Sequence, residues 1–113
     1  MKVIIAGSRG IKDPSVIAKA VKDSGFDVTE VVSGTARGVD LLGELWAFEH
    51  KVAVHRFPAD WNKFGRHAGY VRNFSMAVYA DALIAIWDGK SPGTKMMIDI
   101  AKKKRMPTFV SMA

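Results

Sequence analysis

Short apolar segments that run straight into glycine turns are the feature that most constrains this chain. Val3 to Ala6 and Ala82 to Trp87 are continuously apolar, and Gly7 and Gly89 follow them closely. Strands with helices on both faces of a parallel sheet have this composition, because neither side of the strand meets water. Further strands are predicted at three less uniform segments, namely Val28 to Val32, Val52 to Phe57 and Pro107 to Val110.

Helical patterns fill the intervals between these strands. Asp13-Pro14 is a typical helix start, a second helix is predicted from about Val39 to His50, and a third begins at Tyr70. A fourth is indicated by the apolar spacing of Met96, Met97, Ile100 and Ala101. Strands that alternate with helices imply right-handed βαβ units. We therefore predict an α/β fold: one three-layer domain over residues 1–113, with a mainly parallel five-stranded sheet and helices on both faces.

The composition narrows the classes of partner. The formal net charge of +6 permits phosphorylated or polyanionic partners, but much of it lies in Lys102-Lys103-Lys104-Arg105. Cations at a helix end oppose the negative end of the helix dipole and need no ligand. The chain has no cysteine, which fits a cytoplasmic protein, and no apolar run long enough to cross a bilayer. We expect no membrane partner.

Three glycine loops follow predicted strands directly: Gly7-Ser8-Arg9-Gly10, Ser33 to Asp40, and Asp88 to Thr94. Parallel strands end at the same edge of a sheet, where α/β proteins bind ligands, so the loops should form one pocket. In the second loop, Gly34 and Gly38 are expected to let backbone approach a ligand. The alternative is a glycine-rich turn that carries a solvated arginine.

The side chains of these loops suit an anion. Hydroxyl groups and guanidinium groups donate hydrogen bonds to phosphate oxygens, and the amides of Gly93-Thr94 at a helix start can do the same. Asp40 can either cap its helix or accept a hydroxyl of a ribose. Asp88, placed immediately after a buried strand, is a candidate for polar recognition.

The irregular segment from Pro58 to Gly69 has two interpretations. It mixes aromatic, charged and glycine residues without a clear period, which is typical of a functional loop. Alternatively, Trp61 and Phe64 cover the edge of the core. The three histidines lack the spacing of a metal site, so no metal is predicted. The loops match neither a Walker P-loop nor the G-x-G-x-x-G fingerprint.

Together the motifs resemble the SLOG superfamily of Rossmann-like proteins, which includes DprA (Smf) and the LOG phosphoribohydrolases. Gly7-Ser8-Arg9, Ser33 to Asp40 and Gly89 to Thr94 carry the resemblance. The small YspA-like SLOG family, DUF2493, is the nearest pattern, and it also includes Pro58 to Trp61, Gly65 to Gly69, Arg72-Asn73 and Met76.

The resemblance implies a nucleotide or nucleotide-derived small molecule as ligand, sensed or sequestered in nucleotide signalling or in conflict between phages and bacteria. A LOG-like hydrolase is an alternative, with Arg72 and Asp88 as catalytic candidates. However, Met97 stands where the LOG pattern has its final Glu, and a thioether cannot act as a carboxylate does. Asp88, Asp60 or Glu44 would then have to supply that group. DprA-like binding of single-stranded DNA through Arg37, Trp61, Phe64 and Tyr70 is a further alternative.

The predicted ligand-binding residues come from the three loops, the irregular segment and the helix after it. They are Gly7, Ser8, Arg9, Ser33, Gly34, Thr35, Ala36, Arg37, Asp40, Asp60, Trp61, Arg72, Asn73, Asp88, Gly89, Ser91, Gly93 and Thr94. No cofactor beyond the nucleotide-derived ligand is predicted. Self-association is expected through Met96, Met97 or Tyr79, provided that these side chains are exposed.

Overall fold

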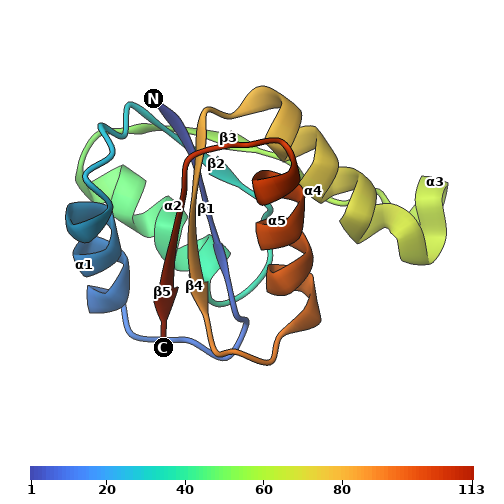
Figure 1. Ribbon diagram of the computed structural model, residues 1–113, viewed down its shortest axis with the longest axis horizontal. Coiled ribbons are helices and arrows are strands. Elements are labelled where there is room, and N and C mark those ends of the chain that lie inside the picture. The colour runs from blue at the N-terminus through green and yellow to red at the C-terminus, as the bar shows by residue number, and fades with distance from the viewer.

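The computed structural model describes residues 1–113 and has a central sheet between two layers of helices (Figure 1). The strands are β1 (Lys2–Gly7), β2 (Glu30–Ser33), β3 (Ala53–Arg56), β4 (Ala82–Trp87) and β5 (Thr108–Met112). The helices are α1 (Ser15–Ser24), α2 (Val39–Glu49), the short α3 (Trp61–Phe64), α4 (Ala68–Tyr79) and α5 (Pro92–Lys103), and a 3-10 turn, η1, spans Gly65–His67. This confirms the predicted α/β fold.

The five strands lie in the order β3-β2-β1-β4-β5, and every neighbouring pair is parallel. The chain builds outward from β1 to β2 and β3, then returns to the other side of β1 to form β4 and β5. The strand order therefore reverses between β1 and β4, which are paired from Val3 with Ala82 to Gly7 with Ile86. Open α/β sheets bind ligands beyond the carboxyl ends of strands at such a reversal.

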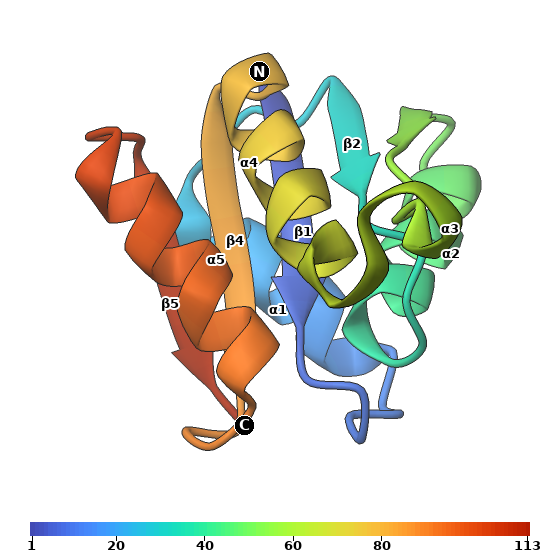
Figure 2. The same cartoon turned by 90° about the vertical axis from the view of Figure 1, so that its right-hand side faces the viewer.

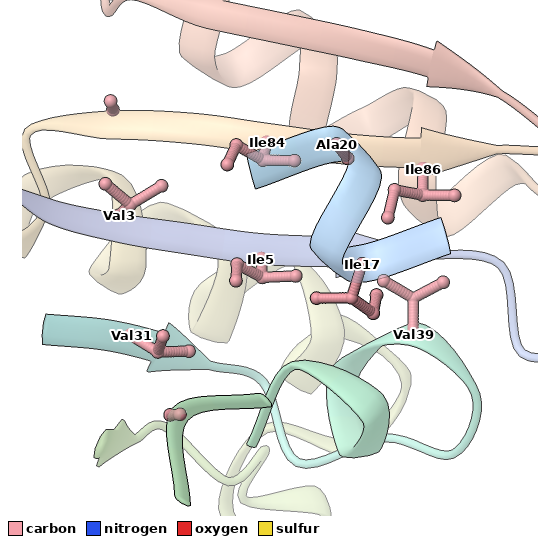
Figure 3. Close-up of a cluster of buried hydrophobic side chains, with 10 residues drawn as sticks. Val3, Ile5, Ile17, Ala20, Val31, Val39, Ile84 and Ile86 are labelled. Carbon is pink, nitrogen blue, oxygen red and sulfur yellow. The ribbon is translucent and has the colours of Figure 1, made fainter. Parts of the chain in front are cut away.

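Each face of the sheet has its own hydrophobic core. On one face, Ile17 of α1 and Val39 of α2 pack against β-strand side chains such as Ile5 and Ile84 (Figure 3). On the other face, α4 and α5 cover the sheet (Figure 2), and Met76 and the other residues of this core are buried there. Alternate residues of β1 and β4 point to opposite cores, which explains why Val3 to Ala6 and Ala82 to Trp87 are continuously apolar.

The structure shows how the helix start at Asp13-Pro14 and the segment from Pro58 to Gly69 are built. Asp13 caps the start of α1, because its Oδ1 accepts hydrogen bonds from the Ser15 amide at 3.0 Å and from the Ser15 hydroxyl at 2.8 Å. The segment predicted as an irregular loop contains α3 and η1 instead. Asp60 caps α3 by accepting a 3.0 Å hydrogen bond from the Lys63 amide. None of the helices is long and apolar enough to cross a membrane.

The exposure assumed for Met97 is wrong, whereas Tyr79 and Met96 are exposed in part. Met97 is 1% exposed within the core between α5 and the sheet, since it lies on the inner face of α5. Tyr79 is only partly exposed, and its hydroxyl donates a hydrogen bond to Glu30. Met96 is also partly covered. Met97 is therefore not available for contact with a second copy.

Candidate functional site

A pocket of about 620 Å³ lies beside the carboxyl ends of β1 and β4. Its walls come from the loop after β1, the start of α2, the α3 to α4 region and the first turn of α5, and Figure 2 shows α4 and α5 over this face of the sheet. The predicted residues that line it are Gly7, Ser8, Arg9, Ala36, Asp40, Trp61, Arg72, Asn73, Ser91, Gly93 and Thr94. The pocket thus gathers residues from all three glycine loops.

The remaining predicted residues lie outside the lining. They are Ser33, Gly34, Thr35, Arg37, Asp60, Asp88 and Gly89. Ser33 is fully buried, and its hydroxyl donates a 2.6 Å hydrogen bond to Glu44, which is also bonded to Arg56. The side chains of Ser33 and Asp60 therefore serve the fold, the first beneath the loop and the second as a helix cap.

The glycines of the first two loops make room for the chain itself. A Cβ on Gly7 would lie 2.1 Å from the Ile86 carbonyl oxygen, and one on Gly38 would lie 2.5 Å from the Ser8 carbonyl oxygen. At Gly34 it would lie 2.8 Å from Asp40 Oδ2. The expected close approach of a ligand to Gly34 and Gly38 is thus replaced by close approach of neighbouring protein atoms. These contacts lock the first two loops together.

The charges of Asp40, which is buried, and Arg72, which is partly buried, act on each other in the pocket wall. The Asp40 carboxylate is 6% exposed and accepts a 3.2 Å hydrogen bond from the Ala36 amide. Burial raises the pKa of Asp40 to about 6, although the Ala36 amide and the positive charge of Arg72 both oppose this rise. Burial likewise lowers the pKa of Arg72, whose guanidinium donates to the Gly34 carbonyl and to Asn73 Oδ1.

The backbone between Gly34 and Asp40 is shaped for this pair. Thr35 has a φ of +65°, which is unusual for a β-branched residue and costs about 1–3 kcal/mol. This turn lies between the Gly34 carbonyl, which faces Arg72, and the Ala36 amide, which faces Asp40. The strained turn therefore helps to position the side chains of Asp40 and Arg72.

Asp88 organises the loop after β4. Its Oδ1 accepts 2.8 Å hydrogen bonds from the amides of Lys90 and Ser91, which lower its pKa to about 2. The Ser91 hydroxyl lies 3.0 Å from both Asp88 Oδ2 and the Ser8 hydroxyl oxygen, and the Asp88 amide donates to Ser8 as well. Asp88 thus ties the first loop to the third and presents the start of α5 to the pocket.

The start of α5 is the open part of the site. The amides of Gly93 and Thr94 have no hydrogen-bond acceptor in the chain, whereas the next amide, that of Lys95, donates to the Ser91 carbonyl. Thr94 is 6% exposed and lines the pocket, yet its hydroxyl makes no hydrogen bond. A Cβ on Gly93 would meet no atom within 4 Å. Three adjacent donors are therefore free to hold an anion.

A family model for the YspA, cpYpsA-related SLOG family matches residues 1–64, which is more than half of the chain. The chain belongs to this SLOG family. It is also 35% identical over 120 residues to the Gene 61 protein of Mycobacterium phage D29, and this comparison covers 96% of the chain and 94% of that protein. No solved structure matches the sequence. The family model thus covers the first two loops and α3, while the similarity to the phage protein extends over the pocket walls made by α4 and α5.

The pocket of this SLOG protein is also lined by residues that were not among the predicted ligand-binding residues. Arg66 and His67 of η1 are exposed and line the pocket. Tyr70, predicted only for DNA binding, faces the same space as Trp61, and their exposed fractions are 51% and 55%. The rest of the lining is Ala6, Gly10, Gly69, Met76, Pro92, Met96 and Met97. Only the Gly65 to Gly69 motif, taken as a unit, indicated that η1 takes part.

The number of carboxylates in the pocket of this SLOG protein limits the acid–base chemistry that the pocket can perform. Asp40 is the one carboxylate in the pocket lining, where it is opposed by Arg9, Arg66 and Arg72. The three other carboxylates considered as substitutes for the LOG glutamate, namely Asp60, Asp88 and Glu44, do not line it. Met97 lies in the wall with its side chain in the core. The site therefore combines many donors with a single carboxylate.

Proposed function

We propose that this protein binds a nucleotide or nucleotide-derived small molecule and holds its phosphate at the start of α5. The observation that carries the proposal is the unpaired set of donors there: the amides of Gly93 and Thr94 and the Thr94 hydroxyl. The first turn of a helix attracts anions because its free amides point along the positive end of the helix dipole. Membership of the SLOG family is compatible with a nucleotide-related role.

The rest of the pocket supports the same class of ligand. Arg9 and Arg66 are exposed, take part in none of the ion pairs of the chain, and can neutralise phosphate charge. Trp61 and Tyr70 offer flat apolar surfaces on which a base can stack. Asp40 is suited to accept a hydrogen bond from a sugar hydroxyl or an amino group. A volume of about 620 Å³ lies within the usual range for small-molecule sites.

Binding is favoured over hydrolysis because the pocket lacks a second carboxylate. Asp40 is already engaged by the Ala36 amide and lies beside Arg72, and Met97 occupies the position of the LOG glutamate. Cleavage of an N-glycosidic bond calls for carboxylates that protonate the leaving group or stabilise positive charge on the sugar. We therefore propose a sensor or sequestering protein. The similarity to a phage protein fits a role in nucleotide signalling or in conflict between phages and bacteria.

Single-stranded DNA is a second candidate ligand, favoured by one observation. Exposed aromatic side chains follow one another over α3 and α4, and a lysine ammonium group lies over two of the rings. The Nζ of Lys63 is 5.2 Å from the Phe64 ring centroid, and the Nζ of Lys104 is 5.6 Å from the Phe74 ring centroid. Stacked aromatics beside cations are typical of single-strand binding surfaces. Its signature would be binding that weakens steeply with salt and is independent of the α5 donors.

The decisive experiment compares Thr94→Val with the wild type. Valine keeps the shape of threonine and removes only the hydroxyl, which faces the pocket without a partner in the chain, so the melting temperature without ligand should not fall. Affinity for the nucleotide that stabilises the wild type should fall about tenfold or more, since a hydrogen bond to a charged group contributes about 1.5–3 kcal/mol. Isothermal titration calorimetry and thermal shift with nucleoside phosphates and NAD derivatives measure both quantities.

A matched pair of charge variants controls for net charge. Arg66→Ala removes a pocket cation and should weaken binding, whereas Lys102→Ala removes the same charge from the last turn of α5 and should not. Mass spectrometry of the recovered ligand distinguishes binding from turnover. If no nucleotide raises the melting temperature, or if Thr94→Val binds as tightly as the wild type, the proposed function is wrong.

A further inference from the structure

Helix α2 packs Val39, Leu42 and Trp46 against the core, but it exposes three other large apolar residues. Gly43 and Ala47 face the sheet, and Ala47 is fully buried. Leu41, Leu45 and Phe48 face away from it, and their exposed fractions are 52%, 47% and 82%. A surface helix normally places its largest apolar side chains toward the core. We call Leu41, Leu45 and Phe48 the α2 stripe.

Close packing on the sheet explains the small inner residues but leaves the stripe unexplained. A Cβ on Gly43 would lie 2.9 Å from the Cγ2 atom of Ile5, so the helix axis sits near the sheet and no larger residue fits there. Two carboxylates lie near the stripe, Asp40 just before it and Glu44 between its ends, and both are engaged elsewhere. Asp40 points into the pocket, and Glu44 is bonded to Ser33 and Arg56.

The spacing of the α2 stripe is that of a helix-to-helix seam. Its members are separated by four and then three residues, which is the alternation of apolar positions along a coiled coil. Side chains at this spacing lie in one line along the helix and can interdigitate with the side chains of a second helix. Burying an exposed leucine or phenylalanine contributes about 1.5–3 kcal/mol when it is covered completely.

We propose that the α2 stripe is the contact through which two copies of this chain associate, with α2 antiparallel to the α2 of the other copy. Charge complementarity supports a second copy as the occupant. Arg37 lies just before α2 and Glu49 lies at its end, both are exposed, and neither belongs to an ion pair within the chain. An antiparallel two-fold arrangement brings Arg37 of each copy toward Glu49 of the other.

The position of α2 leaves room for such a contact. The helix lies on the opposite face of the sheet from α4 and α5 (Figure 1), so a second copy seated there would not contact the pocket walls that these two helices form. A stable interface buries about 800 Å² on each side. The accessible surface of this chain is 6541 Å², so about an eighth of it would be covered. The edge strand β3 contacts α2 and would extend the interface.

A second exposed apolar row, on α4, is the less suitable surface. Tyr70, Phe74 and Val78 are 46–62% exposed, but Tyr70 lines the pocket and the Lys104 ammonium lies over the Phe74 ring. This row is therefore partly committed to other contacts. Val78 supplies a matched control, since it is an exposed apolar residue on the opposite side of the sheet.

The test is the molar mass in solution, measured by light scattering and by sedimentation over a range of concentrations. The wild type should approach twice the chain mass of 12.4 kDa. Leu45→Glu should shift it to the mass of one chain, because a charge in the seam would be buried without a partner. Val78→Glu should leave the dimer intact. Circular dichroism of each variant checks that the fold is kept.

Exchange of charges tests the antiparallel geometry itself. Arg37→Glu or Glu49→Arg alone should weaken association about tenfold, and the double variant should restore it, because each copy then again presents opposite charges. A wild type that remains a monomer up to about 100 µM overturns the proposal. A dimer that survives Leu45→Glu overturns it as well, since the two copies must then associate elsewhere. None of these outcomes depends on a ligand, so the proposed function is tested separately.

Discussion

Asp40 makes the folded protein less stable as the pH rises, and replacing it should remove that dependence. Its carboxyl has a pKa of about 6 in the folded chain, compared with 3.8 for an ordinary aspartate, because it is buried. The folded state therefore holds this proton more tightly than the unfolded state does. Between pH 3.8 and about 6 the free energy of unfolding falls as the proton is lost. A difference of about 2 in pKa corresponds to about 3 kcal/mol.

The assay is urea unfolding of the wild type and of Asp40→Asn between pH 4 and 7. Relative to the variant, the wild type should lose about 3 kcal/mol over this range, most of it below pH 6. Other carboxyl groups titrate in both proteins and cancel in the difference. Asp99→Asn, at an exposed carboxylate paired with Lys95, should produce no comparable change. If the difference between wild type and Asp40→Asn changes by less than about 0.5 kcal/mol, Asp40 is not desolvated as described.

Three further predictions concern the loops around the pocket. Gly7→Ala should destabilise the fold by about 3 kcal/mol or prevent folding, because its Cβ would lie 2.1 Å from the Ile86 carbonyl oxygen. Gly10→Ala, which has open space around it, should leave the free energy of unfolding in urea unchanged. Thr35→Asn should raise the free energy of unfolding by about 0.5–1 kcal/mol, since asparagine tolerates a φ of +65° better. Asp88→Ala should lower the melting temperature at pH 7. The difference in melting temperature between the wild type and this variant should shrink between pH 4 and 2, because the carboxylate of Asp88, with a pKa of about 2, loses its stabilising charge only in that range.

The strands and long helices could be predicted because their signals are local. Ala82 to Trp87 is apolar throughout and forms β4 with the same limits, since helices cover it on both faces. The position of the pocket also followed from the sequence, because parallel strands must end at one edge. The short helix α3 was missed because four residues give no periodicity, and its cap at Asp60 is a single contact.

The roles of individual loop residues could not be predicted, because they depend on atoms that are distant in the sequence. Ser33 was selected as a ligand donor, but its partner is Glu44 on the next helix. Asp88 was selected for recognition, but the amides that follow it within the loop occupy its Oδ1. A glycine pattern shows that something approaches closely. It does not show whether that neighbour is a ligand or, as at Gly38, another segment of the chain.

The three loops therefore differ in the hydrogen-bond donors that they offer to a ligand, and this difference orients the ligand in the proposed complex. The first two loops are closed upon each other through Gly38 and the Ser8 backbone, and Asp88 fastens the third loop to Ser8. Where α5 begins, the adjacent backbone amides of Gly93 and Thr94 have no acceptor in the chain. A phosphate placed there leaves the rest of a nucleotide to extend toward α3 and α4, where the aromatic side chains lie. Variants at α5 should thus affect all phosphorylated ligands alike, whereas variants at the aromatic side chains should change which base is preferred.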